Sequence, residues 1–232
     1  MNIEAKSIYA MGDIHGRIDK LNMFINKKNP DVIILLGDCA FHWYEPEKNI
    51  YSGVSGFWLD DSNFKKVKPN DTKIFWLMGN HQAWNYMELT YGRTGTEPVE
   101  MSPNLFYCPI GSTLNINGKN CLFVGGADST DADTRVNRFE WFSEERLTDA
   151  DYEHIASRVN YVDVMFSHTC PEEFDIQDKW DSLKRVCDPS RKILSISFAN
   201  ENSFLAICNS RSNSSSTSFS VIHFSFGTLL YA

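Results

Sequence analysis

Six side chains that can bind metal ions or move protons stand directly after apolar runs of the sequence. Residues 12–16 read Gly-Asp-Ile-His-Gly, residues 37–38 read Gly-Asp, residues 79–81 read Gly-Asn-His, and residues 167–168 read Ser-His. Carboxylate, amide and imidazole groups suit divalent ions of hard or borderline character rather than a thiolate zinc site. The candidate site residues are therefore Asp13, His15, Asp38, Asn80, His81 and His168.

The apolar runs before these motifs have the length and composition of buried strands. They are Ser7–Met11, Asp31–Leu36, Lys73–Met78 and Tyr161–Phe166. The first run is followed by residues 17–25, whose apolar positions have helical spacing. Strands joined by a helix predict a parallel sheet, and the carboxyl ends of its strands line one crevice where α/β proteins bind ligands. We therefore expect the motifs to meet at one edge of the sheet.

The remainder of the chain predicts more strands than helices. We expect a helix over 57–66, a loop over 128–142 and one or two helices with acidic starts within 143–159. Strands are predicted at 104–108 and 204–208, with hairpins at 113–124, turning at Asn117-Gly118, and at 221–231. Seven serines within 209–220 predict a flexible loop inside a single domain that spans 1–232.

Composition limits the classes of partner. The net charge of −8 argues against strong binding to a nucleic-acid backbone. Bound metal ions can still make a local site positive enough for phosphate. The apolar run Val32–Leu36 is too short to cross a bilayer, and Glu4 and Lys6 interrupt any signal-peptide core, so we expect a cytoplasmic protein with no membrane partner. Six scattered cysteines are expected to be free thiols.

Taken together and in this order, the motifs resemble the calcineurin-like metallophosphoesterase superfamily. Residues 125–129, Gly-Gly-Ala-Asp-Ser, and Trp141-Phe142 also look like its small cytoplasmic and phage-type members. The resemblance implies an α/β fold, a four-layer α/β/β/α sandwich. It also implies a hydrolase that attacks a phosphate mono- or diester with a hydroxide held by two divalent ions. These ions would be manganese, iron or zinc, with manganese the one expected to work in vitro.

The same resemblance implies a role for each candidate residue. Asp13 and His15 would hold the first metal ion, and Asn80 and His168 the second. Asp38, which follows the middle of the three neighbouring strands, would bridge the two ions. His81 would be the acid or base that protonates the leaving oxygen or stabilises the transition state.

The sequence also departs from the family pattern. The family normally has a late Gly-His-x-His motif that completes both metal sites, and the expected place, Cys208–Arg211, lacks it. Each ion would lose a nitrogen ligand unless Asn209, His223 or water replaces it. Residue 82 is glutamine where an acidic residue is usual, so the partner of His81 is open. The alternative function is therefore a catalytically impaired member that acts as a phosphate-binding or interaction module.

Three further points stay open at this level. The substrate could be a small phosphorylated molecule, a nucleotide or a phosphoprotein. His42 could be a metal ligand or a packed histidine. Arg135 could contact a phosphate or be solvated on its loop.

Overall fold

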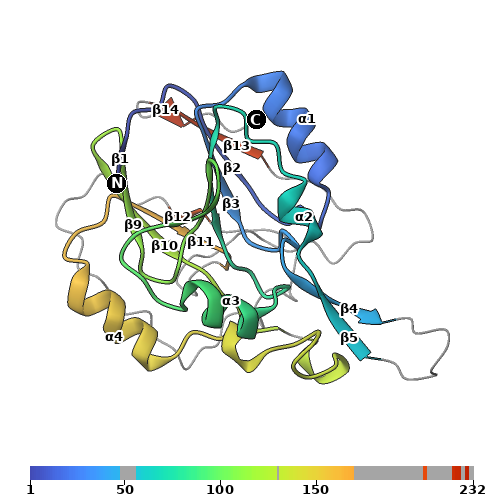
Figure 1. Cartoon of the computed structure of the whole chain (residues 1–232). Coiled ribbons are helices and arrows are strands. Elements are labelled where there is room, and N and C mark those ends of the chain that lie inside the picture. The colour runs from blue at the N-terminus through green and yellow to red at the C-terminus, as the bar shows by residue number, and fades with distance from the viewer. Residues whose placement is uncertain (48–55, 130, 170–205, 208–220, 226–227, 230–232) are drawn as a thin grey trace, which may run out of the picture.

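Two β-sheets that face each other form the centre of the molecule in the computed structural model, which describes residues 1–47, 56–129, 131–169, 206–207, 221–225 and 228–229 (Figure 1). The larger sheet contains, in spatial order, β14 (Thr228–Leu229), β13 (Val221–Ser225), β2 (Ile8–Met11), β3 (Val32–Leu36), β6 (Lys73–Leu77), β8 (Leu105–Tyr107) and β7 (Val99–Ser102). The smaller contains β1 (Asn2–Ile3), β9 (Thr113–Ile116), β10 (Lys119–Val124), β11 (Val164–Ser167) and β12 (Ala206–Ile207).

The three strands that precede the N-terminal motifs are neighbours in the larger sheet. β2 pairs with β3 and β3 pairs with β6, in both cases in parallel. Helix α1 (Ile18–Lys28) connects β2 to β3, as the apolar spacing predicts. The carboxyl ends of all three strands therefore lie at one edge, with β3 in the middle, and the sequence-based expectation is confirmed.

Successive side chains of a strand point to opposite faces of the sheet, and this divides the hydrophobic core into layers. Ile34 and Phe75 point from the larger sheet towards the smaller one, where the ring of Phe75 lies 6.4 Å from that of Phe123 on β10. Leu35 points the other way and packs in a second core with Ile25 of α1. Neighbouring residues of one strand thus serve two different interfaces, because successive side chains leave opposite faces of a strand.

Helix α4 (Asp149–Arg158) covers the outer face of the smaller sheet. Its Ile155 packs in the same core as Leu122 and Met165, which point away from the larger sheet. Thr148 and Asp151 form a capping box at its start, as expected for a helix with acidic first residues. The order of layers is helix, sheet, sheet, helix, which confirms the four-layer α/β/β/α sandwich.

Arg93 connects α4 to neighbouring elements through hydrogen bonds. Its guanidinium donates two hydrogen bonds to the carboxylate of Asp151, at 2.8 and 2.7 Å, and one to Glu88 at 2.7 Å. Glu88 belongs to helix α3 (Trp84–Tyr91). The same guanidinium reaches the carbonyl oxygens of Glu144 and Arg146. The side chain of Arg93 therefore joins helix α3, helix α4 and the segment 144–146 that precedes α4.

The predicted helix over 57–66 is wrong. Residues Gly56–Asp60 form strand β5, which pairs antiparallel with β4 (Trp43–Glu47), and helix α2 covers only Ser62–Lys65. The aromatic residue Phe57 stacks on Phe139 with ring centroids 4.4 Å apart, a contact distant in sequence that favours the extended form. The two strands make a ribbon that projects from the body of the molecule (Figure 1).

The other predicted elements agree with the structure where it describes them. The hairpin β9–β10 turns at Asn117 and Gly118, both at positive φ, and β13 and β14 form the closing hairpin. The loop over 128–142 holds one turn of 3₁₀ helix, Ala132–Thr134, and Ser143–Glu145 forms another. β11 begins at Val164, later than predicted. The expectations for 208–211 and 209–220 lie outside the described residues.

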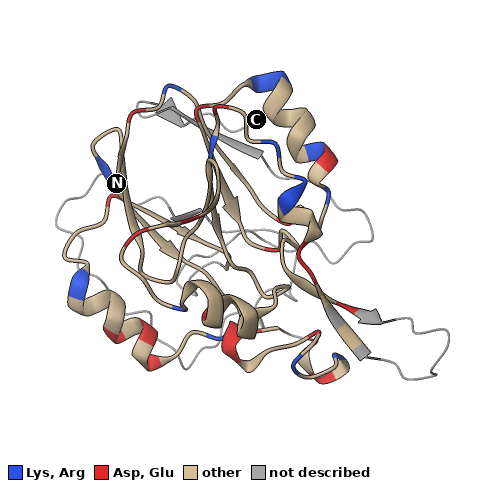
Figure 2. Cartoon of the chain, viewed as in Figure 1, with Lys and Arg blue, Asp and Glu red and all other residues tan. Residues whose placement is uncertain are grey.

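Charged residues are distributed unevenly over the described part of the chain. Lysines lie on α1 and α2, and α1 also carries Asp19, whereas α4 and the loops that lead to it carry acidic side chains interspersed with arginines (Figure 2). Within the described residues, every helix is too short or too polar to cross a membrane.

Candidate metal centre

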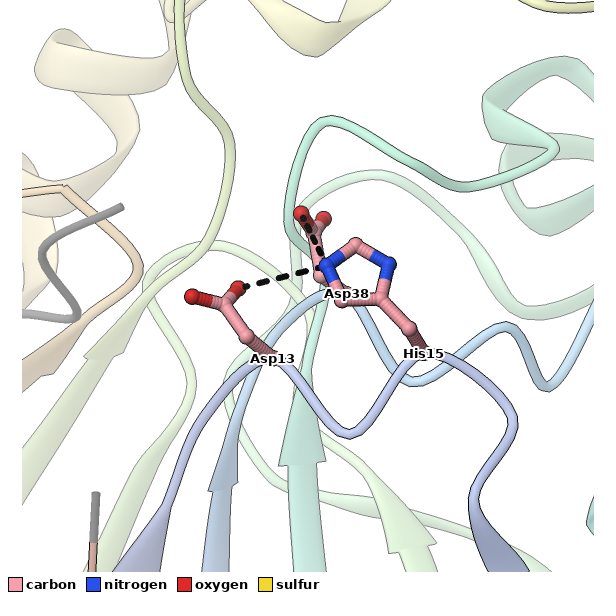
Figure 3. A group of neighbouring side chains, drawn as sticks. All are labelled: Asp13, His15 and Asp38. Carbon is pink, nitrogen blue, oxygen red and sulfur yellow. Dashed lines mark ion pairs between the residues drawn. The ribbon is translucent and has the colours of Figure 1, made fainter. Parts of the chain in front are cut away.

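Asp13, His15 and Asp38 form the first group of candidate ligands. One ligand atom of each lies within 4.8 Å of those of the other two. His15 Nε2 lies 4.0 Å from Asp13 Oδ1 and 3.8 Å from Asp38 Oδ2, so both carboxylates face the same ring nitrogen (Figure 3). Asp13 and His15 come from the loop after β2, and Asp38 follows β3. The arrangement brings two oxygens and one nitrogen towards a common point, as a divalent ion requires.

The backbone of this group is held in a conformation that non-glycine residues rarely adopt. Asp13, His15 and Asp38 have φ values of 52°, 40° and 47°. Each such residue costs about 1–3 kcal/mol, and such residues cluster at functional sites. The loops support each other, because the His15 amide donates to the Asp38 carbonyl at 2.8 Å. The surrounding fold thus maintains local strain at the positions where the side chains converge.

His168, Asn80 and Asp38 form a second group on the other side of the Asp38 carboxylate. His168 Nδ1 lies 2.6 Å from the carbonyl oxygen of Leu36, which can only accept, so this nitrogen carries a proton. His168 Nε2 lies 3.1 Å from Asn80 Oδ1 and 3.6 Å from Asp38 Oδ1. The orientation of the Asn80 amide follows from its Nδ2, which donates to Ser129 Oγ at 2.9 Å.

These contacts leave three acceptor atoms facing one another. With the ring proton of His168 on Nδ1, the neutral imidazole presents a lone pair at Nε2, towards the two side-chain oxygens. A second ring proton or a divalent cation would satisfy all three. The same donor set, nitrogen with amide and carboxylate oxygen, is one that manganese, iron and zinc accept.

Two glycines make room for the Asp38 carboxylate and the His168 ring. A Cβ atom at Gly79 would overlap Asp38 Oδ1 and approach the His168 ring to 2.8 Å. A Cβ atom at Gly37 would overlap His168 Nδ1 and come within 2.8 Å of the Gly79 backbone. The glycines that precede Asp38 and Asn80 are therefore required by the close approach of two strand ends and a histidine from the opposite sheet.

Asp38 is completely buried, yet its environment favours the charged form. Burial raises its pKa, but the positive charge that His168, His81 and His15 carry when protonated, together with the backbone amide of His81, holds the pKa below its ordinary value. That amide donates to Oδ1 at 2.9 Å, while Oδ2 has no hydrogen-bond partner. A buried anionic oxygen without a partner is costly, and a cation at this point would compensate it.

The carboxylate of Asp38 also connects the two groups. Its Oδ2 faces His15 and its Oδ1 faces His168, so each oxygen belongs to one group. This geometry fits a carboxylate that bridges two ions. The donor sets, the orphaned oxygen and the space kept by the glycines all fit bound divalent metal.

His81 lies beside both groups and is partly buried. Its Nε2 lies 2.9 Å from Arg135 Nη2. Because a guanidinium only donates, this nitrogen of His81 is the acceptor. The ring also contacts His15 and Trp43, with centroids 5.5 and 5.6 Å away. The side chain of Arg135 is only 9% exposed, so the solvated alternative for this arginine is wrong.

Comparison with known proteins gives the family. Residues 6–195 match the family described as calcineurin-like phosphoesterase. The chain belongs to this family. A lariat debranching enzyme of Schizosaccharomyces pombe is 29% identical over 140 residues, which cover 56% of this chain and 27% of that protein. The present phosphoesterase chain therefore spans only a fraction of that relative's length.

His42 and Gln82 of this phosphoesterase do not belong to either group of candidate ligands. His42 is fully buried among aromatic rings, with Phe64 and Tyr86 at centroid distances of 5.0 and 5.1 Å. Burial lowers its pKa to about 4, which keeps it neutral, and neither ring nitrogen has a hydrogen-bond partner. It is a packed histidine and does not join the group of Asp13. The side chain of Gln82 likewise makes no hydrogen bond, so it does not act as the partner of His81.

Sequence reasoning missed Ser129 and Glu145 as parts of this phosphoesterase site. Ser129 orients Asn80, and Glu145 is fully buried and accepts from the Ser129 amide at 2.8 Å. The signal was present, because Ser129 ends the Gly-Gly-Ala-Asp-Ser motif and Glu145 follows Trp141-Phe142 closely. His223 lies in β13, where its backbone pairs with Tyr9, and Asn209 lies outside the described residues.

Proposed function

We propose that the protein hydrolyses phosphate mono- or diesters with two divalent metal ions. Asp13 and His15 would hold the first ion, Asn80 and His168 the second, and Asp38 would bridge them. One observation carries the proposal: the two oxygens of a single buried carboxylate face two separate groups of acceptor atoms. Family membership supports it independently, because it indicates a hydrolase acting on phosphate ester bonds.

The metal ions would supply a water molecule of lowered pKa and neutralise charge on the phosphate. The protein's own residues contribute position and proton transfer. The strand ends hold the ligands at strained but supported backbone angles, so little reorganisation is needed when substrate binds. His81 Nε2 is the proposed site of proton transfer to or from the ester oxygen, because it lies beside both ligand groups.

Manganese is the ion we propose for assays, since a mixed oxygen and nitrogen donor set accepts it. Membership of the family identifies the bond that is hydrolysed, a phosphate ester, but not the molecule that carries this bond. The net charge of −8 supports a compact phosphorylated substrate over an extended nucleic-acid backbone.

The test is hydrolysis of a chromogenic phosphodiester and a chromogenic monoester by metal-stripped protein into which Mn²⁺ is titrated. We expect metal-dependent turnover that His81→Ala lowers by roughly a hundredfold or more, the usual scale for a general acid or base. His154→Ala is the matched control, because this histidine is also partly buried but lies on α4 and bonds to Gly95.

Two outcomes would refute the proposal. Wild-type protein that shows no turnover at any Mn²⁺ concentration would favour the phosphate-binding module. Turnover that His81→Ala and His154→Ala reduce equally would show that His81 has no role in proton transfer.

A further inference from the structure

Arg135 is the charged side chain that approaches the candidate centre from the loop after the smaller sheet's hairpin. Its Nη2 donates to His81 Nε2 at 2.9 Å and pairs with Asp131 Oδ1 at 2.6 Å. Its Nη1 lies 3.3 Å from Ser129 Oγ and 3.5 Å from the carbonyl oxygen of Glu140. The guanidinium therefore contacts the residue proposed for proton transfer and the serine that orients the ligand Asn80.

These partners are weak for a nearly buried guanidinium. The imidazole nitrogen, the hydroxyl and the carbonyl are neutral, and Asp131, which carries the charge, is 45% exposed. Arginine forms its strongest contacts with phosphate and carboxylate oxygens, through two parallel charge-assisted hydrogen bonds. Asp131 offers the guanidinium a single carboxylate oxygen at the exposed side of the loop, whereas a phosphoryl group bound beside His81 would offer two oxygens side by side.

We propose that Arg135 binds the phosphoryl oxygens of the substrate. In the free protein, its Nη2 occupies His81 Nε2; when the ester binds, the guanidinium transfers this hydrogen bond to a phosphoryl oxygen. His81 Nε2 then faces the ester oxygen. The inference rests on the proposed function, and it adds a residue to the site that the metal-ligand motifs do not contain.

A network beneath the loop holds the guanidinium in this position. Glu145 Oε1 accepts hydrogen bonds from the Ser129 amide at 2.8 Å and from Trp141 Nε1 at 3.1 Å. A Cβ atom at Gly126 would overlap the Glu145 carbonyl oxygen, so the start of this loop lies tightly against Glu145. Ser129 is thereby held between Asn80 and Arg135, where its hydroxyl contacts both side chains.

Arg138 on the same loop provides a matched comparison. Its side chain is 53% exposed and its guanidinium pairs with Glu144 rather than with any candidate site residue. Arg135 and Arg138 therefore differ in what they face, although both carry the same charge and lie three positions apart.

The experiment is calorimetric titration of inorganic phosphate into Mn²⁺-loaded wild type, Arg135→Gln, Arg135→Lys and Arg138→Gln. Loss of a hydrogen bond to a charged group should weaken phosphate binding about tenfold to a hundredfold in Arg135→Gln. Arg135→Lys should recover part of the affinity, because lysine keeps the positive charge but lacks the planar pair of N–H donors that can bind two phosphoryl oxygens. The phosphate affinity of Arg138→Gln should stay within about twofold of that of the wild type, since solvent-exposed charges contribute little.

Michaelis constants for the chromogenic ester separate the outcomes further. Arg135→Gln should raise KM in parallel with the phosphate dissociation constant. Phosphate affinity within twofold of wild type in Arg135→Gln would overturn the inference, whatever happens to thermal stability. So would wild-type protein that binds no phosphate. Absence of turnover in a wild type that binds phosphate through Arg135 would instead refute the proposed function and leave the inference supported.

Discussion

Glu145 offers a direct test of the network beneath the site, because its burial should make protein stability depend on pH. Burial raises the pKa of this carboxyl from 4.5 to about 7, and hydrogen bonds from Ser129 and Trp141 and the charge of Arg135 oppose that shift only in part. The native state therefore holds the proton more tightly than the unfolded state. Between these two pKa values the native protein binds more protons, so its stability falls as the pH rises.

The magnitude follows from the shift. One pKa unit corresponds to about 1.4 kcal/mol, so the full destabilisation by ionised Glu145 is about 3 kcal/mol above pH 8. About 2.5 kcal/mol of this should develop between pH 5 and pH 8. Glu145→Gln keeps the shape of the protonated side chain but cannot ionise. The variant should therefore gain stability relative to wild type as the pH rises.

The assay is urea unfolding of wild type and Glu145→Gln at pH 5, 6, 7 and 8, after treatment with chelator. Glu144→Gln is the control, because hydrogen bonds and the charge of Arg138 outweigh burial and lower the pKa of Glu144. Its difference from wild type should stay constant over this range, since the carboxyl is ionised in both states. A constant difference for Glu145→Gln as well would refute the reasoning about the buried carboxyl.

Three further predictions follow from contacts described above. Gly79→Ala should abolish turnover because its Cβ overlaps the Asp38 carboxylate, whereas Gly118→Ala, with nothing within 4 Å, should cost only about 1 kcal/mol of stability in urea and no activity. Arg93→Ala should lower the free energy of unfolding by about 3–5 kcal/mol because it leaves Asp151 buried without its partner; a loss below about 1 kcal/mol would contradict this. Mn²⁺ at about a hundred times its dissociation constant should stabilise metal-stripped protein by about 2.7 kcal/mol in thermal melts, and Asp38→Asn should remove the effect.

The centre of the larger sheet could be predicted from sequence because its strands are buried on both faces. Continuous apolar runs that end in glycine identify β2, β3 and β6, and their parallel pairing follows from the helix between the first two. The placement of Asp38 in the middle followed from strand order. The gathering of Asp13, His15 and Asp38 can thus be predicted from the sequence alone.

The ribbon β4–β5 could not be predicted in the same way. Residues 57–66 carry both aromatic and helix-compatible side chains, and local preference did not distinguish a strand from a helix. The deciding contact, Phe57 on Phe139, joins positions far apart in the chain. The contacts of Arg135 and Glu145 could not be predicted from the sequence, although the sequence offers both residues, because these contacts depend on which loop lies against the Asn80-His81 pair.

The hydrogen bond between His168 and the Leu36 carbonyl has a consequence for how the protein matures. It joins two sheets across 132 positions of sequence, and His168 is the candidate ligand that the smaller sheet supplies. The other candidate ligands follow strands of the larger sheet and can gather before the second sheet docks. The second group of donors exists only once the sandwich has closed, so a partly folded chain would carry an incomplete centre. Only molecules in which both sheets have docked would then be able to hydrolyse phosphate esters. Newly synthesised or partly unfolded molecules would stay inactive.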